Sequence, residues 1–264
     1  MSFVDPSLIP STGNPALDAH HRRIAEKVNG LFEGWQAGWP LASQNALLDT
    51  ILEEIDDHFI AEKMLTRGAG YHGWAGHEPL HDALRAKMAG FRAAVADEET
   101  HASAMVDAFR FFEDLIFAHE FDDDQDFWDL FTDGDRAAGT PLIDWAPEHT
   151  VGHEEVDRQH ARLVALVNEV NAALAGPDAD AALDKLLTLR QATKRHFESE
   201  EDMMRAEGHP DLKEHMAAHR MLIRDMDEAC SRCRAGRIEE TRDFVARGLK
   251  YWFVDHVTHW DERL

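Results

Sequence analysis

The sequence predicts an all-α protein that consists of two tandem up-down-up-down four-helix bundles. Apolar residues recur at helical intervals along most of the chain, and no segment alternates between apolar and polar residues with a period of two. A set of histidine and acidic residues also occurs twice in the same order, and His58 and His196 show that the two copies lie 138 positions apart. A repeat of this kind predicts that one helical bundle is followed by a second.

The first bundle is predicted to follow an extended arm, residues 1 to about 14, in which proline and glycine disfavour a helix. Its helices are predicted over about residues 15–35, 41–67, 77–96 and 101–119. The first two helices are separated by Gly38-Trp39-Pro40, and a glycine-rich turn over residues 68–76 ends the second. The short connections favour antiparallel neighbours.

The second bundle repeats this plan. Its helices are predicted over about residues 154–174, 181–206, 212–235 and 238–261. We therefore predict a first domain over residues 1–128, a linker over 129–144 and a second domain over 145–264. The apolar residues Phe127, Trp128, Leu130 and Phe131 are expected to pack on a domain or to fill the space between the two, because they are too apolar for a free tether.

Each half contains histidine and acidic residues in the order His, His, Glu, His, His, His, Asp. Within each half, the second histidine precedes the glutamate by four residues, and the third histidine precedes the fourth by four, so each pair shares one face of a helix. In the first half these residues are His21, His58, Glu62, His77, His81, His119 and Asp124. In the second half they are His160, His196, Glu200, His215, His219, His256 and Asp261.

Five imidazoles and two carboxylates in a helical bundle fit a site for two mid-row transition metal ions. Imidazole is a suitable ligand for iron, and a carboxylate can bridge two metal ions. Two assignments in the first half have neighbouring rivals. His20 could compete with His21, although Asp18 matches Asp157 and favours His21. The last acidic ligand is assigned to Asp124, which two further aspartates directly precede.

This constellation resembles the hemerythrin family, over roughly residues 14–124 and 145–264. The second half contains Trp145, then VGHEEVDRQH ending at His160, then HFESEE, HMAAH and YWFVDHVTHWD. The first half keeps all seven positions but differs around them. It has His20 where the second half has Gln159, Lys63 where it has Glu201, and Leu115 where it has Trp252.

The resemblance implies one di-iron centre in each domain, and therefore four Fe per chain. In the second half it implies that His215, His219 and His256 bind one iron, that His160 and His196 bind the other, and that Glu200 and Asp261 bridge both together with an oxo or hydroxo group. The corresponding sets in the first half are His77, His81 and His119, then His21 and His58, with Glu62 and Asp124 as bridges.

The family binds O2 reversibly at the open position of the iron that has two histidines, and holds it as a hydroperoxide. The resemblance therefore implies an oxygen-binding protein for storage, transport or scavenging, and not an enzyme. The ligand pocket is expected to include the residue three positions before the last histidine, which is Ile116 in the first half and Phe253 in the second. Family members usually have leucine there.

Two other functions compete with reversible O2 binding. One is a di-iron enzyme that handles peroxide or NO, but relatives that repair damage tend to replace a histidine with glutamate, and here every histidine is kept. The other is an O2 or redox sensor, which usually carries a membrane or signalling module. We expect no such module, because the chain ends three residues after Asp261.

Composition excludes other classes of protein. A formal net charge of −24 argues against nucleic acid and anionic membranes as partners. There is no apolar run near 18 residues, and the first residues lack a basic start and an apolar core, so we expect a cytoplasmic protein without a membrane span. Cys230 and Cys233 form a CxxC in a helical segment, and we expect two reduced thiols rather than a zinc or redox site.

Overall fold

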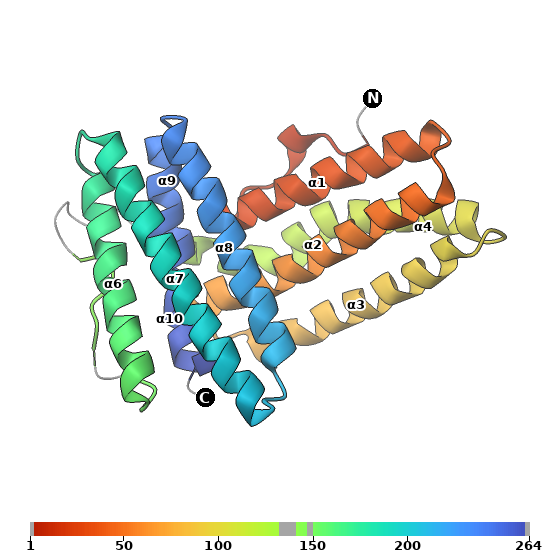
Figure 1. Cartoon of the computed structure of the whole chain (residues 1–264). Coiled ribbons are helices and arrows are strands. Elements are labelled where there is room, and N and C mark those ends of the chain that lie inside the picture. The colour runs from red at the N-terminus through yellow and green to blue at the C-terminus, as the bar shows by residue number, and fades with distance from the viewer. Residues whose placement is uncertain (1–2, 132–140, 147–149, 262–264) are drawn as a thin grey trace. The chain divides into compact units, whose positions relative to one another are not determined.

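The structure, a computed structural model, describes residues 3–131, 141–146 and 150–261. Within those ranges it is helical and contains no strand, which confirms the predicted all-α class (Figure 1). The chain divides into two compact units. One consists of the described residues of 1–13, 17–63 and 71–132, and the other of the described residues of 14–16, 64–70 and 133–264.

The first bundle has four principal helices with short connections between them. They are α1 (Pro15–Gln36), α2 (Leu41–Gly68), α3 (Trp74–Ala96) and α4 (His101–Glu113). The fourth helix continues as a π-helical segment over Asp114–Asp124, followed by α5 (Gln125–Trp128) and a 3-10 turn over Asp129–Phe131. These limits agree with the sequence prediction to within three residues at each start, so the breaks at Gly38 and at the glycine-rich turn are real helix ends.

The second bundle repeats this arrangement. Its first three helices are α6 (Glu154–Leu174), α7 (Ala179–Glu207) and α8 (Leu212–Arg234). The fourth helix of this bundle is made of four consecutive segments: α9 (Ile238–Asp243), a π-helical segment over Phe244–Leu249, α10 (Lys250–Asp255) and a second π-helical segment over His256–Trp260. Asp178 begins α7 as its cap and accepts a hydrogen bond from Ala181, and Gly208 ends it with φ +67°.

Both bundles use an asparagine to fasten the chain that precedes their first helix. Asn29 on α1 accepts from the amide of Val4 at 2.8 Å and donates to its carbonyl at 2.9 Å. Asn168 on α6 accepts from the amide of Leu142 at 2.7 Å and donates to the carbonyl of Ile143 at 2.8 Å. Leu142 and Ile143 lie in the predicted linker, and the structure adds that they are buried and attached to the second bundle. The exact domain limits stay a prediction.

The π-helical segments explain why the last histidine and the aspartate of each half are five residues apart. On an α-helix with 3.6 residues per turn, residues five apart point to different faces. A π-helix closes i to i+5 hydrogen bonds, so residues five apart come onto one face. His119 and Asp124 lie at such a spacing in Asp114–Asp124, and His256 begins the π-helical segment that Asp261 caps. The repeated spacing therefore reflects a repeated local change of helix type.

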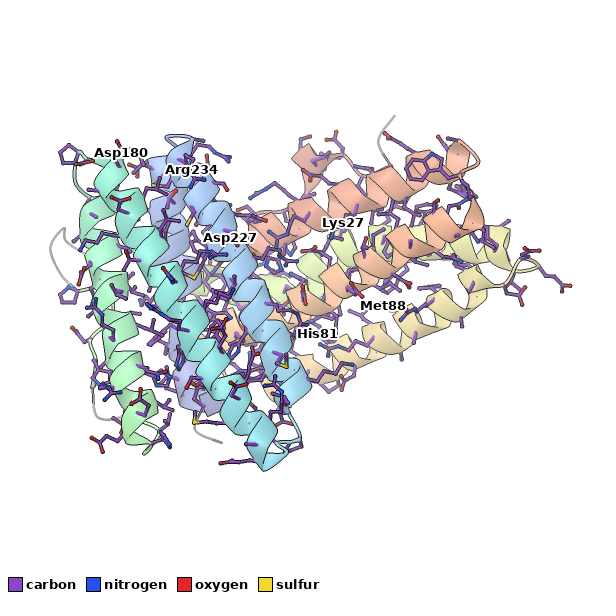
Figure 2. All side chains as sticks on the ribbon, in the orientation of Figure 1. Lys27, His81, Met88, Asp180, Asp227 and Arg234 are labelled. Atoms are coloured by element: carbon purple, nitrogen blue, oxygen red, sulfur yellow. The ribbon has the colours of Figure 1, made fainter. Side chains whose placement is uncertain are left out.

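Glu54 of α2 is a buried carboxylate that connects two helices of the first bundle. It is 2% exposed and accepts from Arg23 at 2.9 Å and from Lys27 at 2.6 Å, and both partners lie on α1 (Lys27 is labelled in Figure 2). Arg23 and Lys27 are partly exposed. Water can therefore replace part of the hydrogen bonding that they lose when the carboxylate of Glu54 is removed.

We therefore expect Glu54→Ala to lower the free energy of unfolding by about 1–3 kcal/mol. The neighbouring Glu53 is exposed on the same helix, so Glu53→Ala is a matched control that should change stability by less than about 0.5 kcal/mol. Urea unfolding of the two variants measures the difference. Equal stability of the two variants would show that the connection between α1 and α2 contributes nothing.

Candidate metal centres

In the second bundle, the seven predicted ligands come from all four helices and converge inside the bundle. One histidine lies on α6, a histidine and a glutamate on α7, two histidines on α8, and the last histidine with the aspartate at the end of the chain's described part. None of the seven side chains is more than 3% exposed. The interior therefore holds five imidazoles and two carboxylates that water does not reach.

Two overlapping groups of side chains form this cluster. One group is Glu200, His215, His219 and His256, and the other is His160, His196, Glu200 and Asp261. Within each group, one nitrogen or oxygen atom from every residue lies within 4.8 Å of those of the others. Because Glu200 belongs to both groups, its carboxylate lies between two places where donor atoms converge.

Asp261 also lies between the two groups of donor atoms. Its Oδ2 lies 3.0 Å from Nε2 of His160, and its Oδ1 lies 3.1 Å from Nε2 of His256. The imidazoles also face one another through the same nitrogen. Nε2 of His160 is 3.2 Å from Nε2 of His196, and Nε2 of His219 is 3.2 Å from Nε2 of His256. The donor atoms therefore form two adjacent pockets joined by two carboxylates.

In two of the imidazoles, the hydrogen-bond partner of Nδ1 determines which ring nitrogen carries the proton. Nδ1 of His219 lies 2.9 Å from Oε1 of Glu201, and Nδ1 of His196 lies 3.0 Å from Oε1 of Gln159. These oxygens only accept, so we assign the proton to Nδ1 in both rings. Nε2 then carries a lone pair that points into the cluster, which is the form of histidine that binds metal ions.

The charges in the cluster are not balanced by the protein alone. Burial, with the neighbouring charge of Glu200, raises the pKa of Asp261 well above its ordinary value. Burial also lowers the pKa of His160 to about 4 and that of His256 well below its ordinary value. These two imidazoles are therefore neutral at pH 7, and the two carboxylates repel each other. Divalent cations between them would supply the missing positive charge, so the residues fit a pair of metal ions.

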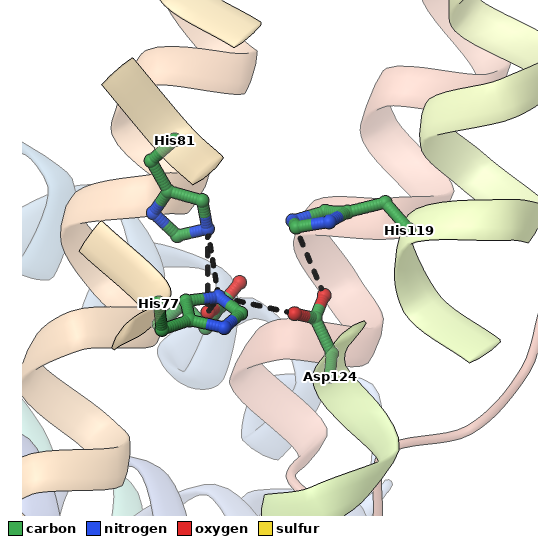
Figure 3. Close-up of side chains that lie close together, drawn as sticks. His77, His81, His119 and Asp124 are labelled. Carbon is green, nitrogen blue, oxygen red and sulfur yellow. Dashed lines mark hydrogen bonds and ion pairs between the residues drawn. The ribbon is translucent and has the colours of Figure 1, made fainter. Parts of the chain in front are cut away.

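The first bundle contains a corresponding cluster. Glu62, His77, His81, His119 and Asp124 offer donor atoms that all lie within 4.8 Å of one another. Figure 3 shows how His77, His81, His119 and Asp124 face one another. Oε1 of Glu62 is 2.9 Å from Nε2 of His77 and 3.5 Å from that of His81. Oδ1 of Asp124 is 3.2 Å from Nε2 of His77, and its Oδ2 is 3.6 Å from Nε2 of His119.

The remaining two predicted ligands of the first bundle lie beside Glu62. Nε2 of His58 is 3.5 Å from Oε2 of Glu62 and 3.4 Å from Nε2 of His21. His20, the rival of His21, is also buried, and its ring centre is 6.0 Å from that of His58. Asp123, one rival of Asp124, lies instead behind a histidine, 2.9 Å from Nδ1 of His119.

Electrostatics in the first cluster differ from those in the second. Although burial lowers it, contacts with Asp124 and Glu62 raise the pKa of His77 to about 10. Burial lowers the pKa of His81 to about 3. A proton on His77 would therefore balance part of the carboxylate charge here until a metal ion bound to Nε2 displaced it. In the second cluster, burial lowers the pKa values of His160, His196, His215 and His256.

Aromatic rings hold the imidazoles from outside in both bundles. Phe197 stacks on His219 with ring centres 3.6 Å apart, and Phe59 stacks on His81 at 4.1 Å. Trp252 stacks on His256 at 4.4 Å, whereas Leu115 is the corresponding residue of the first bundle. Stacking fixes the orientation of each ring and excludes water from its outer face.

The two clusters differ in the carboxylate that supports a ligand histidine. In the second, Glu201 lies behind His219, as described above. In the first, Lys63 occupies that sequence position and pairs with Glu78, while Asp123 lies behind His119. A carboxylate behind an imidazole makes it a stronger ligand. The roles of Glu201, Gln159 and Asp123 were not evident from the sequence, because no spacing rule identifies a hydrogen bond to Nδ1.

A small apolar cavity adjoins the second cluster. Its volume is about 10 Å³, close to the minimum that holds one water-sized molecule. The lining side chains are mostly aliphatic or aromatic, and they include Phe253 and the ligand candidates His196 and His256. Thr193 is the one hydroxyl among the lining residues, and it donates to the carbonyl of Leu189 at 3.0 Å. Ile116, the counterpart of Phe253, is buried in the core of the first bundle.

Two further sequence features have a clear position. Cys230 and Cys233 are both free and buried on α8, where burial raises the pKa of each thiol. Among the helices that the structure describes, none is long and apolar enough to cross a lipid bilayer.

A comparison with known families matches both halves of the chain. The family model described as hemerythrin HHE cation binding domain matches residues 12–130 and 151–264. The bacteriohemerythrin of Stenotrophomonas maltophilia (strain R551-3) is 26% identical over 116 residues, which are 44% of this chain and 74% of that protein. The bacteriohemerythrin of Pseudomonas aeruginosa (strain UCBPP-PA14) is 28% identical over 117 residues, 44% of this chain and 75% of that protein.

A hemerythrin-like protein of Naegleria gruberi is 26% identical over 115 residues, which are 44% of this chain and 84% of that protein. Each of these alignments covers less than half of this chain. The two matches to the family model and the two helical bundles lead to one conclusion: this chain belongs to the hemerythrin family and contains two hemerythrin domains.

Proposed function

We propose that the chain is a non-haem di-iron protein that binds O2 reversibly for storage, transport or scavenging, with one di-iron centre in each domain. The observation that carries this proposal is the second cluster, in which Glu200 belongs to both groups of donor atoms and Asp261 has one oxygen near each. Two metal ions that share two carboxylates account for this arrangement, and imidazole-rich donor sets suit iron.

The ligand roles follow from the two groups of donor atoms. Besides the shared carboxylates, one group offers His215, His219 and His256, and the other offers only His160 and His196. The ion bound by two histidines therefore has fewer protein ligands and keeps a position for a small exogenous ligand. We propose the corresponding roles for the seven residues of the first bundle, with Glu62 and Asp124 as the shared carboxylates.

Iron in both positions would supply the electrons that hold O2 and recover them on release. The protein's own residues provide an apolar surrounding that keeps water and protons away from the bound ligand. Phe253 and Trp252 line the cavity beside His196 and His256, so the cavity reaches both groups of donor atoms. Bulk at Phe253, where the family usually has leucine, narrows this space.

The lining of the cavity also favours binding over catalysis. Apart from the ligand histidines, its described residues offer no carboxyl, amine or imidazole that could protonate a peroxide oxygen. An enzyme that splits peroxide needs a proton donor within hydrogen-bond reach of its substrate. The proposal therefore assigns O2 as the partner and no enzymatic turnover, and a cytoplasmic location without nucleic-acid or membrane partners stays a prediction from composition.

The proposal predicts close to four iron ions per chain and a visible band that appears with O2 and disappears on its removal. His160→Ala and His21→Ala each remove one histidine from the ion with two histidines, in the second and the first bundle respectively. Each variant should lose about half of the oxygen-dependent band while the other centre persists. Iron determination with spectra through an oxygenation cycle measures both.

An oxygen-dependent band of unchanged intensity in both variants would contradict the assignment of these histidines. Iron that is bound without a reversible band, together with turnover of peroxide or NO well above that of free iron, would instead support the enzyme.

Removal of metal should destabilise the fold, because each empty cluster leaves buried carboxylates without compensating charge. Saturation at 100 times the dissociation constant stabilises a folded protein by about 2.7 kcal/mol per site. We expect thermal unfolding under anaerobic conditions to move to higher temperature by several degrees with Fe²⁺. Mg²⁺ is the control, since it prefers oxygen ligands and should have little effect. Equal shifts with both ions would indicate surface binding.

Phe253→Leu tests the proposed ligand pocket. The smaller side chain should enlarge the cavity, speed ligand entry and raise the rate at which the oxygenated form oxidises irreversibly, several-fold, without changing the iron content. Ile116→Leu in the first bundle is the control of nearly equal volume and should have a small effect. Stopped-flow mixing with O2 and the decay of the oxygenated band measure the two rates. An unchanged rate in Phe253→Leu would place ligand entry elsewhere.

A further inference from the structure

We propose that Tyr71 and Trp74 form an electron relay between the first metal centre and the protein surface. The proposal rests on the proposed function only in that the first cluster holds iron. Its purpose would be to supply an electron to a peroxide at a centre that has only one electron left, so that oxidation ends on a surface tyrosine and spares the ligands.

The relay begins at the ligand histidines. Trp74 is the first residue of α3, and its ring centre is 5.0 Å from that of His77 and 5.8 Å from that of His81. Trp74 is 8% exposed, so its ring lies against the cluster and mostly out of water. It is the first easily oxidised side chain outside this group of ligands.

The next ring leads outward. The centre of Tyr71 is 6.1 Å from that of Trp74, and the two rings are nearly perpendicular at 88°. Tyr71 is only partly buried, so part of this residue is open to solvent. Two short transfers between neighbouring rings are much faster than one transfer over the combined distance, because electron tunnelling falls off exponentially with distance.

Two neighbours contact the ring of Tyr71. Its phenol end lies over Gly73, where a Cβ atom would collide with the phenolic oxygen and Cζ. The ring centre of Phe127 is 5.5 Å from that of Tyr71 and 5.9 Å from that of His77. Tyr71 therefore packs on the turn between α2 and α3 and on an aromatic ring that also lies beside a ligand histidine.

The second bundle lacks this pair. At the 138-residue offset that relates α3 to α8, Tyr71 corresponds to His209 and Trp74 to Leu212. There, Trp260 lies 5.4 Å from His215 instead, from a different helical segment. The tyrosine–tryptophan pair thus distinguishes the two centres of one chain.

Hydrogen peroxide would take up two electrons, together with two protons from solvent, its O–O bond would break, and two water molecules would form. Iron bound in a half-oxidised cluster would supply one electron and become ferric, and Trp74 would supply the other. Tyr71 would then reduce the oxidised Trp74 and release its phenolic proton to solvent, which leaves a neutral tyrosyl radical. A one-electron reductant of the thiol or ascorbate class then restores the phenol with a proton from water.

Electron paramagnetic resonance after rapid freezing tests the relay, because the chain has only two tyrosines, Tyr71 and Tyr251. Half-oxidised, iron-loaded full-length protein is mixed with hydrogen peroxide. We expect a tyrosyl signal in the unmodified protein and in Tyr251→Phe, and its loss in Tyr71→Phe. Trp74→Phe keeps an aromatic ring that is hard to oxidise, and it should reduce the Tyr71 signal at least several-fold with an unchanged iron content.

Three results would overturn the relay. These are a signal that persists in Tyr71→Phe and is lost in Tyr251→Phe, a signal unchanged in Trp74→Phe, and no signal in unmodified protein that has its full iron content. The proposed function is judged separately, by the reversible oxygen band. Protein that oxygenates reversibly but forms no radical would contradict the relay alone, and a Tyr71 radical without a reversible band would contradict O2 binding alone.

Discussion

The structure depends on the burial of two carboxylates among five imidazoles in each bundle. Glu200 and Asp261 lie where water does not reach, and burial with mutual repulsion raises the pKa of Asp261 well above its ordinary value. An apolar interior tolerates such a pair when one carboxyl is protonated or when positive charge lies between them. Two divalent ions would satisfy both carboxylates and the imidazole lone pairs at once. The four helices of the bundle therefore bring together donor atoms that lie far apart in the sequence.

The two bundles surround their clusters with different supporting groups. In the first, Asp123 supports His119. In the second, Glu201 supports His219, and an apolar cavity adjoins the cluster. Differences in the supporting carboxylates change the basicity of the ligands. Two centres that share one set of ligand types can thus differ in chemistry within one chain.

The helices can be predicted from the sequence because apolar spacing and helix breaks are local signals, as the starts of α1, α2 and α6 show. The repeated residues that converge in the clusters can also be found from their spacing. The π-helical segments that bring His256 and Asp261 together cannot be predicted in this way, since hydrogen bonding to the fifth residue has no sequence signature. Contacts between segments far apart in the sequence also cannot be predicted, because no local pattern of residues indicates them. Asn168 fastens Leu142 and Ile143 to the second bundle, although those two residues read as part of a linker.

Anomalous X-ray diffraction at the iron edge, from crystals of iron-loaded protein, tests the paired metal sites most directly. We expect two pairs of iron peaks, with each pair inside one bundle and bridged by the two carboxylates of that bundle. Glu200 and Asp261 should contact both ions of the second pair. A single ion in a bundle, or iron peaks outside the two clusters, would contradict the claim that each set of five histidines and two carboxylates is built for two metal ions.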